Sequence, residues 1–258
     1  MKICVLIKQV PSEDSQISIS NDRKSIKLDT LNLISNEPDT YALEEALQLK
    51  EKSGGEVTVC TFGPESSRQV LKDALAKGAD KGIFISDEEI ENKSPLKIAK
   101  IITEFIKDEK FDLLLTGLQS NDQGFAQVGL LIAEYLNTSH ASLVMGTEII
   151  DNNCIKVKLE LENGWFQWSN LDLPASLTIQ SGINTPRYAT LPGIMSVKNK
   201  VVDSFSKKDI SVNLNNDDYR VTEIFQPIKS KETKIIDGGS DDIVEEIIDV
   251  LKNKLKVI

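Results

Sequence analysis

The sequence of 258 residues predicts a doubly wound α/β fold with a mostly parallel sheet, extended by a β-hairpin and by a C-terminal arm that ends in a helix. Short, continuous apolar runs recur through the first two thirds of the chain, as in parallel strands that are buried on both faces. Between these runs the apolar residues recur at three- and four-residue spacing, which is typical of helices that bury one face. Strands that alternate with helices in this way form a parallel sheet covered on both faces.

Four apolar runs are the predicted parallel strands. Each run is too short for a helix and is followed by a helical pattern. They occupy residues 3–7, 57–61, 82–85 and 111–116.

Four helices are predicted between and after these strands. The first begins at Asp39, which can act as its N-cap, and ends at Gly54. The third starts with Ser94 as N-cap and Pro95 at its first position, where no intrahelical N–H is needed. The other two cover residues 66–77 and 125–136.

Two further segments have the alternating polarity of antiparallel strands. Residues 17–28, between the first strand and the first helix, alternate around Asn21-Asp22 and predict a small hairpin. After His140, residues 155–161 alternate strictly and are followed by the hairpin turn Asn163-Gly164. Residues 165–168 form the predicted returning strand, and residues 175–179 a further strand.

The C-terminal part of the chain differs from the rest. Residues 182–200 predict an irregular segment, residues 203–240 are polar and predict an extended arm, and residues 241–258 predict an amphipathic helix. We therefore expect an α/β domain over residues 1–200 and an arm with a terminal helix over residues 201–258. One face of that helix carries Ile243, Ile247, Ile248, Leu251 and Leu255.

Composition and charge exclude several classes of protein. The net charge of −10 disfavours binding to nucleic acid. No apolar run approaches the roughly 18–20 residues of a membrane span, and the N-terminal run lacks the features of a signal peptide, so we expect no membrane insertion. Cys4, Cys60 and Cys154 are far apart and odd in number, which predicts no disulfide framework, no zinc site and a reducing, cytoplasmic setting.

Few side chains could support catalysis. The single histidine, His140, follows a helix end, and Cys4 and Cys60 lie in predicted buried strands, so packing roles are expected. The sequence contains neither a GxGxxG motif after a strand nor a GxxxxGK[ST] motif. These observations predict that the chain is not itself an enzyme and has no catalytic residue.

Two strand-to-helix junctions could instead bind a ligand. In an open α/β sheet, ligands bind at the carboxyl ends of the strands, where the N–H groups of a helix start can hold a phosphate. Residues 116–129 combine small residues with amide side chains at such a junction, and residues 35–39 precede the first helix. Both junctions are expected at the same edge of the sheet.

Five sequence blocks resemble, in order and spacing, the β subunit of electron transfer flavoproteins. The first, at residues 36–39 and 42–47, resembles that family's N-P-x-D-x-x-A-L-E-E-A stretch, although Glu37 separates Asn36 from Pro38. The last resembles its partner-recognition loop. The blocks are residues 36–47, 62–64, 76–80, 112–129 and 186–195.

The resemblance implies an adenine-nucleotide-binding α/β domain within an αβ heterodimer. The α subunit would hold most of a redox-active FAD, and this chain would bind an AMP without a redox role. The C-terminal arm and helix would then wrap the α subunit. The residues that match the family's nucleotide site are Leu6, Asn36, Glu37, Pro38, Asp39, Phe62, Gly117, Gln119, Ser120, Asn121, Asp122, Gln123, Gly124, Phe125, Ala126, Gln127 and Val128.

The resemblance also implies transient partners. Flavin-dependent dehydrogenases would dock at the recognition loop, with Leu191 as an apolar anchor, and a quinone-linked oxidoreductase would accept the electrons downstream. Residues 182–188 are most similar to the branch that serves methylamine-type dehydrogenases. The residues that match the docking loop are Pro186, Arg187, Tyr188, Leu191, Pro192 and Met195.

Other functions remain open at this stage. Residues 126–129 also resemble bifurcating members of the family, which hold a second FAD in place of AMP and act with NADH, although residues 182–188 favour AMP. An adenine-nucleotide sensor without flavin is a second alternative. A nucleotide-hydrolysing or adenylating enzyme on a related fold is a third.

Overall fold

The computed structural model describes residues 1–28, 31–89, 93–210, 220–227 and 233–257. The chain divides into two compact units, Met1–Glu223 and Ile224–Ile258, and each is described here by itself. The predicted arm therefore lies partly outside the described residues.

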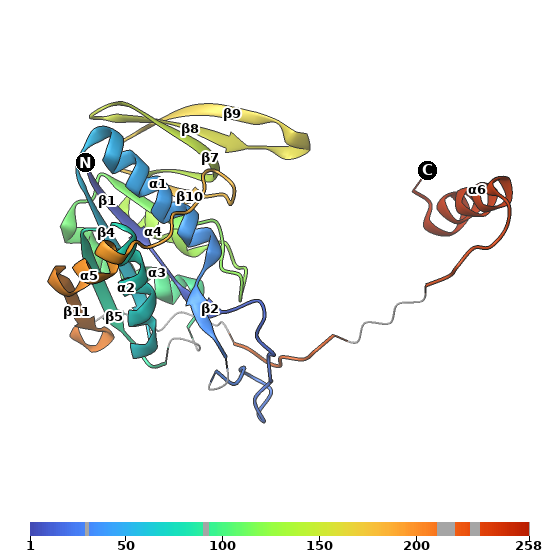
Figure 1. The fold of residues 1–258 in the computed structure, drawn as a ribbon, viewed down its shortest axis with the longest axis horizontal. Helices are drawn as coiled ribbons and strands as arrows, with labels where there is room; N and C mark the ends of the chain where they lie inside the picture. Colours follow the sequence, from blue (N-terminus) through green and yellow to red (C-terminus); the bar gives the residue numbers. More distant parts are fainter. Residues whose placement is uncertain (29–30, 90–92, 211–219, 228–232, 258) are drawn as a thin grey trace. The chain divides into compact units, whose positions relative to one another are not determined.

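The first unit is built on one sheet of nine strands, in the order β11-β5-β4-β1-β6-β10-β7-β8-β9. The pairs from β11 to β7 are parallel, and β7, β8 and β9 pair antiparallel. The doubly wound, mostly parallel sheet that the sequence predicts is therefore confirmed (Figure 1). The strands are β1 (Lys2–Leu6), β4 (Glu56–Gly63), β5 (Lys81–Ser86), β6 (Leu113–Gly117), β7 (Ser139–Asp151), β8 (Cys154–Glu160), β9 (Phe166–Asp172), β10 (Ala175–Ile179) and β11 (Val202–Ser206).

Helices cover both faces of this sheet. Side chains of α1 and α2 pack with one set of strand residues, including Ile3 and Val59, and side chains of α3 and α4 pack with the other set, including Cys4 and Ile85. Alternation of buried side chains between two faces is what a central parallel strand requires. The helices of this unit are α1 (Glu37–Ser53), α2 (Arg68–Lys77), α3 (Pro95–Ile106), α4 (Val128–Leu136) and the short α5 (Leu191–Ser196).

Successive strands are added on one side of β1 first and then on its other side. From β1 the chain proceeds through α1, β4 and α2 to β5 on one side, and then crosses through α3 to β6 on the other side. The carboxyl ends of β1 and β6 therefore diverge at a topological switch point, where open α/β sheets hold their ligands.

The starts of two helices differ from the prediction. The N-cap of α1 is Asn36, and Asp39 lies within the first turn with its carboxylate bound to other segments. Helix α4 begins at Val128 because Gly124 and Ala126 adopt positive φ angles of 64° and 53°, which a helix cannot include. The predicted cap of α3 is confirmed, since the Ser94 side chain accepts the N–H of Lys97.

The antiparallel segments follow the prediction in part. The hairpin of β8 and β9 is confirmed, with Asn163 and Gly164 at positive φ in its turn. Between residues 17 and 28 only the bridge of Ile19 with Ile26 is antiparallel, and the two-stranded pairing lies at the base of this excursion instead. Its strands are β2 (Gln9–Pro11) and β3 (Leu33–Ser35).

Several of the described elements were not predicted from the sequence. Strand β7 pairs in parallel with β10 and then antiparallel with β8. Its buried and exposed residues therefore do not alternate regularly along the sequence. Helix α5 and a 3₁₀ turn (Val197–Asn199) lie within the segment expected to be irregular. Residues 202–206, expected in the arm, form the edge strand β11, whose polar side chains face solvent.

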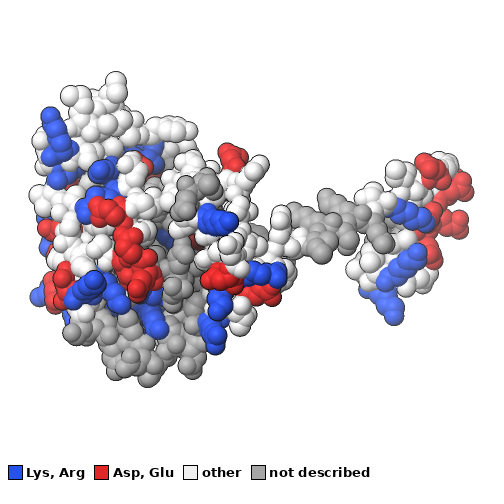
Figure 2. Space-filling model, turned by 90° about the horizontal axis from the view of Figure 1, so that it is seen from below, with Lys and Arg blue, Asp and Glu red and all other residues white. Residues whose placement is uncertain are grey.

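The second unit contains the predicted amphipathic helix, α6 (Ser240–Asp249), which continues as a π-helix (Val250–Leu255). Its first turn carries Asp241 and Asp242, and its last turn Lys252 and Lys254, so the charges complement the helix dipole. Among the described residues no helix has the length and apolar character needed to cross a membrane. Acidic and basic residues are interspersed over the face of the first unit in Figure 2.

Candidate functional site

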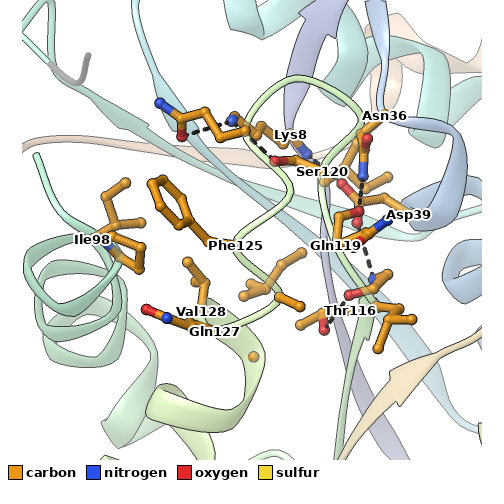
Figure 3. Close-up of a pocket in the computed structure, with 18 of the residues that line it drawn as sticks. Lys8, Asn36, Asp39, Ile98, Thr116, Gln119, Ser120, Phe125, Gln127 and Val128 are labelled. Carbon is orange, nitrogen blue, oxygen red and sulfur yellow. Dashed lines mark hydrogen bonds between the residues drawn. The ribbon is translucent and has the colours of Figure 1, made fainter. Parts of the chain in front are cut away.

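A pocket lies at the switch point, beside the carboxyl ends of β1 and β6. Loop 118–127, which joins β6 to α4, and helix α3 complete its wall (Figure 3). The predicted nucleotide-site residues that line it are Leu6, Asn36, Asp39, Phe62, Gly117, Gln119, Ser120, Gln123, Phe125, Ala126, Gln127 and Val128.

Asp39 joins three segments at the base of the pocket. One carboxylate oxygen accepts the N–H of Lys8, which follows β1, at 2.8 Å, and the other accepts the N–H of Gly117, the last residue of β6, at 2.9 Å. Burial raises the pKa of the Asp39 carboxyl to about 6, although these hydrogen bonds oppose the rise. Asp39 therefore holds the first turn of α1 against both strands.

Gly117 is required by this arrangement. A Cβ at this position would lie 2.5 Å from Oδ1 of Asp39 and 2.6 Å from the carbonyl carbon of Pro38. Real Cβ atoms do not approach other heavy atoms so closely. The absence of a side chain thus lets α1 begin directly against the end of β6.

Asn36 fixes the first half of loop 118–127. Its side-chain N–H donates to the carbonyl oxygen of Gln119 at 3.0 Å, and its side-chain oxygen accepts the N–H of Asn121 at 2.9 Å. Asn36 is 1% exposed. A buried amide with both ends paired holds one loop conformation, because any other would leave polar atoms unpaired.

The second half of the loop leads into the start of α4. Gly124 and Ala126 have positive φ angles, and the side chain of Gln127, the N-cap of α4, makes no capping hydrogen bond. The first N–H groups of a helix lack intrahelical partners, so an uncapped helix start can bind an anion. Gly129 packs so tightly that its Cβ would lie 2.5 Å from Oγ1 of Thr116.

The opposite wall of the pocket is apolar. In Figure 3, Ile98 on α3 lies beside Phe125 and Val128, on the side of the pocket away from Asn36 and Asp39. Phe62, at the carboxyl end of β4, is also buried there. An apolar wall opposite a polar loop suits a ligand with a flat, apolar ring and an anionic group.

Five predicted residues do not line the pocket directly. Asn121 and Asp122 belong to the loop, where Asn36 accepts the backbone N–H of Asn121 and Lys8 pairs with the carboxylate of Asp122. The remaining three are Glu37, Pro38 and Gly124.

Sequence reasoning missed other lining residues. Lys8 follows a strand end, where position alone indicates a ligand edge, and Ile98 and Ile102 share one face of α3. The missed residues are Ile7, Lys8, Cys60, Pro95, Ile98 and Ile102. Thr116, Leu118 and Gly129 also line the pocket and lie within the predicted junction 116–129. Among the lining residues that the structure describes, Lys8 is the single cation.

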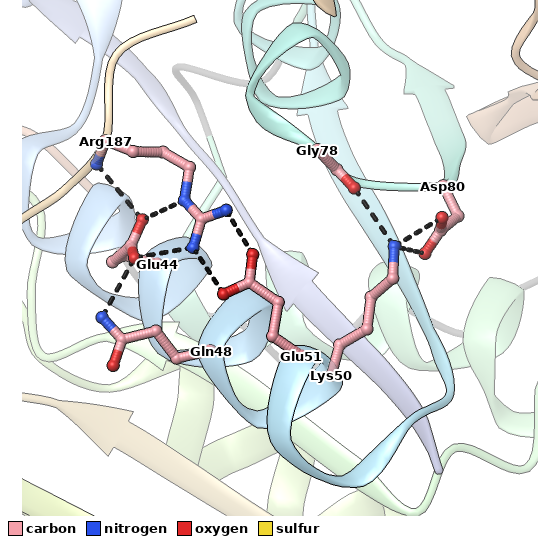
Figure 4. Close-up of polar contacts among 7 residues, drawn as sticks. All are labelled: Glu44, Gln48, Lys50, Glu51, Gly78, Asp80 and Arg187. Atoms are coloured by element: carbon pink, nitrogen blue, oxygen red, sulfur yellow. Dashed lines mark hydrogen bonds and ion pairs between the residues drawn. The ribbon is translucent and has the colours of Figure 1, made fainter.

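A second feature is the segment predicted as a docking loop. The Arg187 guanidinium forms paired hydrogen bonds with Glu44, at 2.8 and 2.9 Å, and with Glu51, at 2.5 and 3.2 Å (Figure 4). Burial alone would raise the pKa of Glu44, but the hydrogen bonds from Arg187 hold it below its ordinary value. Arg187 thus fastens the segment onto α1.

Beyond Arg187 the same segment projects apolar side chains. Tyr188 is 92% exposed, Leu191 77% and Met195 67%. Pro192 is also exposed, and Pro186 is half-buried. A Cβ on Gly193 would collide with the carbonyl oxygen of Ala76, so α5 packs closely on the end of α2. Exposed apolar side chains on a braced backbone suit a transient protein contact.

Comparison with known proteins gives a consistent result. A family model described as electron transfer flavoprotein domain matches residues 26–210. Electron transfer flavoprotein subunit beta from Methylophilus methylotrophus is 35% identical, with 97% of this chain and 98% of the relative covered. The protein of the same name from Bacillus subtilis is 31% identical over the full length of both chains. The human subunit is 32% identical over 83% of this chain and 84% of its own length.

Proposed function

Because this chain belongs to the family of electron transfer flavoprotein β subunits, we propose that it binds AMP in the pocket at the switch point and forms a heterodimer with an α subunit. In the heterodimer it helps to enclose an FAD that the α subunit mostly holds. Electrons pass from docked dehydrogenases to that flavin and on to an acceptor.

The shape of loop 118–127 is the observation that carries the AMP proposal. Asn36 and Asp39 hold the loop at the end of β6, and the loop delivers the uncapped start of α4 to the pocket. A phosphate fits against such a helix start, and the adenine fits between the apolar side chains of Phe62, Ile98 and Phe125.

The flavin supplies the redox chemistry when it is bound, and the protein supplies position and environment. On this proposal the chain's own side chains bind and orient, and none of them breaks or forms a covalent bond. The family's role in electron transfer accords with this division.

The docking proposal rests on the segment that Arg187 fastens to α1. Tyr188, Leu191 and Met195 offer a small apolar surface on a braced backbone. Such a surface suits a dehydrogenase that must bind, deliver electrons and leave. A methylamine-type dehydrogenase is the first donor to test, and a quinone-linked oxidoreductase is the proposed downstream acceptor.

The terminal helix is the proposed contact with the α subunit. Val244, Ile247, Ile248 and Leu255 are 54%, 43%, 40% and 60% exposed, and an apolar helix face needs a surface to cover it. We place the heterodimer in the cytoplasm, since all three cysteines are free thiols and such thiols suit a reducing compartment.

Nucleotide content tests the proposal. The full chain would be co-purified with its α subunit and denatured, and the released nucleotides would be identified by chromatography. One FAD and one AMP per heterodimer are expected. Two FAD and no AMP would identify a bifurcating complex with NADH-linked activity. A preparation that contains neither flavin nor α subunit would contradict the proposal. That result would favour an adenine-nucleotide sensor.

A further inference from the structure

Lys8 and Asp122 form an ion pair on the polar side of the pocket. The Lys8 ammonium lies 2.7 and 2.6 Å from the two carboxylate oxygens of Asp122. It also lies 3.4 Å from Oγ of Ser120 and 3.4 Å from Oε1 of Gln123. All four acceptors belong to loop 118–127, so one cation contacts three side chains in the middle of the loop. Figure 3 shows Lys8 beside one of them, Ser120.

The backbone of Lys8 is itself fixed on both sides. Its N–H donates to Asp39, and its carbonyl oxygen accepts the N–H of Asn36 at 2.8 Å. Lys8 stands two residues beyond Leu6, the last residue of β1, and the strand order changes direction beside that strand. The Lys8 backbone is therefore held in place by hydrogen bonds while its ammonium contacts the loop.

The loop needs such support. Asn36 pairs with the backbone at Gln119 and Asn121 only, and beyond Gln123 the chain passes through two residues at positive φ, Gly124 and Ala126. A non-glycine residue in this conformation is strained, and it persists only when the surrounding contacts hold it. The Lys8 contacts lie directly before that stretch.

We propose that Lys8 is a positioning residue, which holds loop 118–127 in its nucleotide-binding shape through Asp122 and does not itself contact the phosphate. The proposal deepens, and rests on, the proposed binding of AMP in this pocket.

Two observations favour positioning over direct contact. The ammonium already has four acceptors within 3.4 Å, so a phosphate would have to displace a bidentate carboxylate. Burial alone would raise the pKa of Asp122, but the charge and hydrogen bonds of Lys8 hold it below its ordinary value, so Asp122 stays ionised at neutral pH.

The two arrangements predict opposite effects of Asp122→Asn. If Lys8 acts through Asp122, this substitution loosens the loop and weakens AMP binding. If Lys8 contacts the phosphate, the substitution frees the cation and AMP binds as tightly as before or more tightly.

The test measures AMP affinity by calorimetry, on full-length chain in complex with its α subunit after removal of bound nucleotide. Lys8→Met and Asp122→Asn are each expected to weaken AMP binding by about fivefold, the effect of one partly buried ion pair. The double variant is expected to bind no more weakly than Lys8→Met alone, because that substitution already removes the ion pair. Lys8→Arg should retain the affinity of the wild type.

The chain offers a matched control in the pair of Lys50 with Asp80. Its ammonium also lies 2.6 Å from the carboxylate, and the two side chains are 26% and 35% exposed, against 33% and 22% for Lys8 and Asp122. Neither residue lines the pocket. Lys50→Met should leave AMP affinity unchanged. An equal loss in this variant, or tighter binding by Asp122→Asn, would overturn the proposal.

Hydrogen exchange supplies a readout that does not depend on nucleotide. Backbone amides of residues 118–127 should exchange faster in Lys8→Met and Asp122→Asn than in the wild type, and those of α2 should not. Unchanged exchange in the loop contradicts the positioning role. A wild-type heterodimer without AMP would instead refute the proposed function, and the exchange data would still decide whether Lys8 holds the loop.

Discussion

The carboxylate of Asp39 accepts the backbone N–H of Gly117 at 2.9 Å, although the two residues stand 78 positions apart in the chain. This bond joins the first turn of α1 to the end of β6. With the bond from Lys8 to the other oxygen, it gives the pocket a base made of three segments that the sequence keeps separate.

Asp39→Asn should change how stability depends on pH. The pKa of this carboxyl is about 6 in the folded chain, against an ordinary 3.8, so the folded form binds more protons between these values. The contribution of Asp39 to the free energy of unfolding therefore falls as the pH rises from about 4 to about 6. Urea unfolding across this range should show the wild type losing stability relative to Asp39→Asn, with a constant difference above about pH 7. Thr40→Ser, a change in the same helical turn that leaves the Asp39 carboxyl in place, should show no such trend relative to the wild type.

Gly117→Ala should destabilise the first unit by about 2 kcal/mol, because the added methyl group meets Asp39 and the backbone of Pro38. Thermal unfolding measures the loss. Gly239→Ala is the control, since its φ is −72° and a Cβ there finds its nearest neighbour at 3.4 Å. Equal effects of the two substitutions would show that close packing at Gly117 is not the cause.

Arg187→Met should destabilise the chain by about 2 kcal/mol at neutral pH, because Glu44, with a side chain 6% exposed, loses its charged partner. The hydrogen bonds from Arg187 hold the pKa of Glu44 below 4.5, so the stabilisation is complete above that value and is lost as the pH falls below it. The difference between wild type and variant in urea unfolding should therefore shrink below about pH 4. Lys107→Met, in an exposed pair with Glu104, should cost less than about 0.5 kcal/mol.

Leu191→Ala should slow electron transfer from a partner dehydrogenase by about tenfold, since truncation of an exposed apolar anchor typically costs more than 1 kcal/mol of binding. Stopped-flow reduction of the heterodimer at several dehydrogenase concentrations measures the effect. FAD and AMP contents should not change, because Leu191 does not line the pocket. Ile17→Ala, at a side chain that is 60% exposed in the excursion after β2, is the matched control. Equal rates for wild type and Leu191→Ala would refute the docking role.

Removal of residues 241–258 should lower the yield of heterodimer without altering the unfolding of the first unit. The exposed apolar face of α6 is the proposed contact, and no residue of that helix is buried within the chain. Size-exclusion chromatography after co-expression with the α subunit measures the yield. An unchanged heterodimer peak would show that this helix does not contribute to the interface.

The sequence predicts elements whose signal is local. The apolar runs that became β1, β4, β5 and β6, and the turn at Asn163-Gly164, depend on neighbouring residues and on burial at both faces of a central strand. Strand β11 could not be predicted in this way, because its polar residues form a strand only when the edge of β5 is available to pair with them.

In the candidate site, too, the local features could be predicted from sequence and the long-range contacts could not. The glycines and amides of loop 118–127 mark a ligand junction from sequence alone. The contacts of Asp39 and Lys8 cannot be predicted from sequence, since they join residues that come close only when the sheet is complete. For the same reason Asp39 looks like an N-cap in the sequence, whereas in the structure it connects strands.

The separation of Asp39 from Gly117 also affects the order in which the protein can fold during its synthesis. At about 5–20 residues per second, Gly117 is made roughly 4–16 s after Asp39, and Asp122 follows Lys8 by a longer interval still. Until then the Asp39 carboxylate can hold only the chain that follows β1, through the N–H of Lys8, and loop 118–127 does not exist. The pocket proposed for AMP is therefore incomplete until about half of the 258 residues have been made, and AMP cannot stabilise the emerging chain before that point.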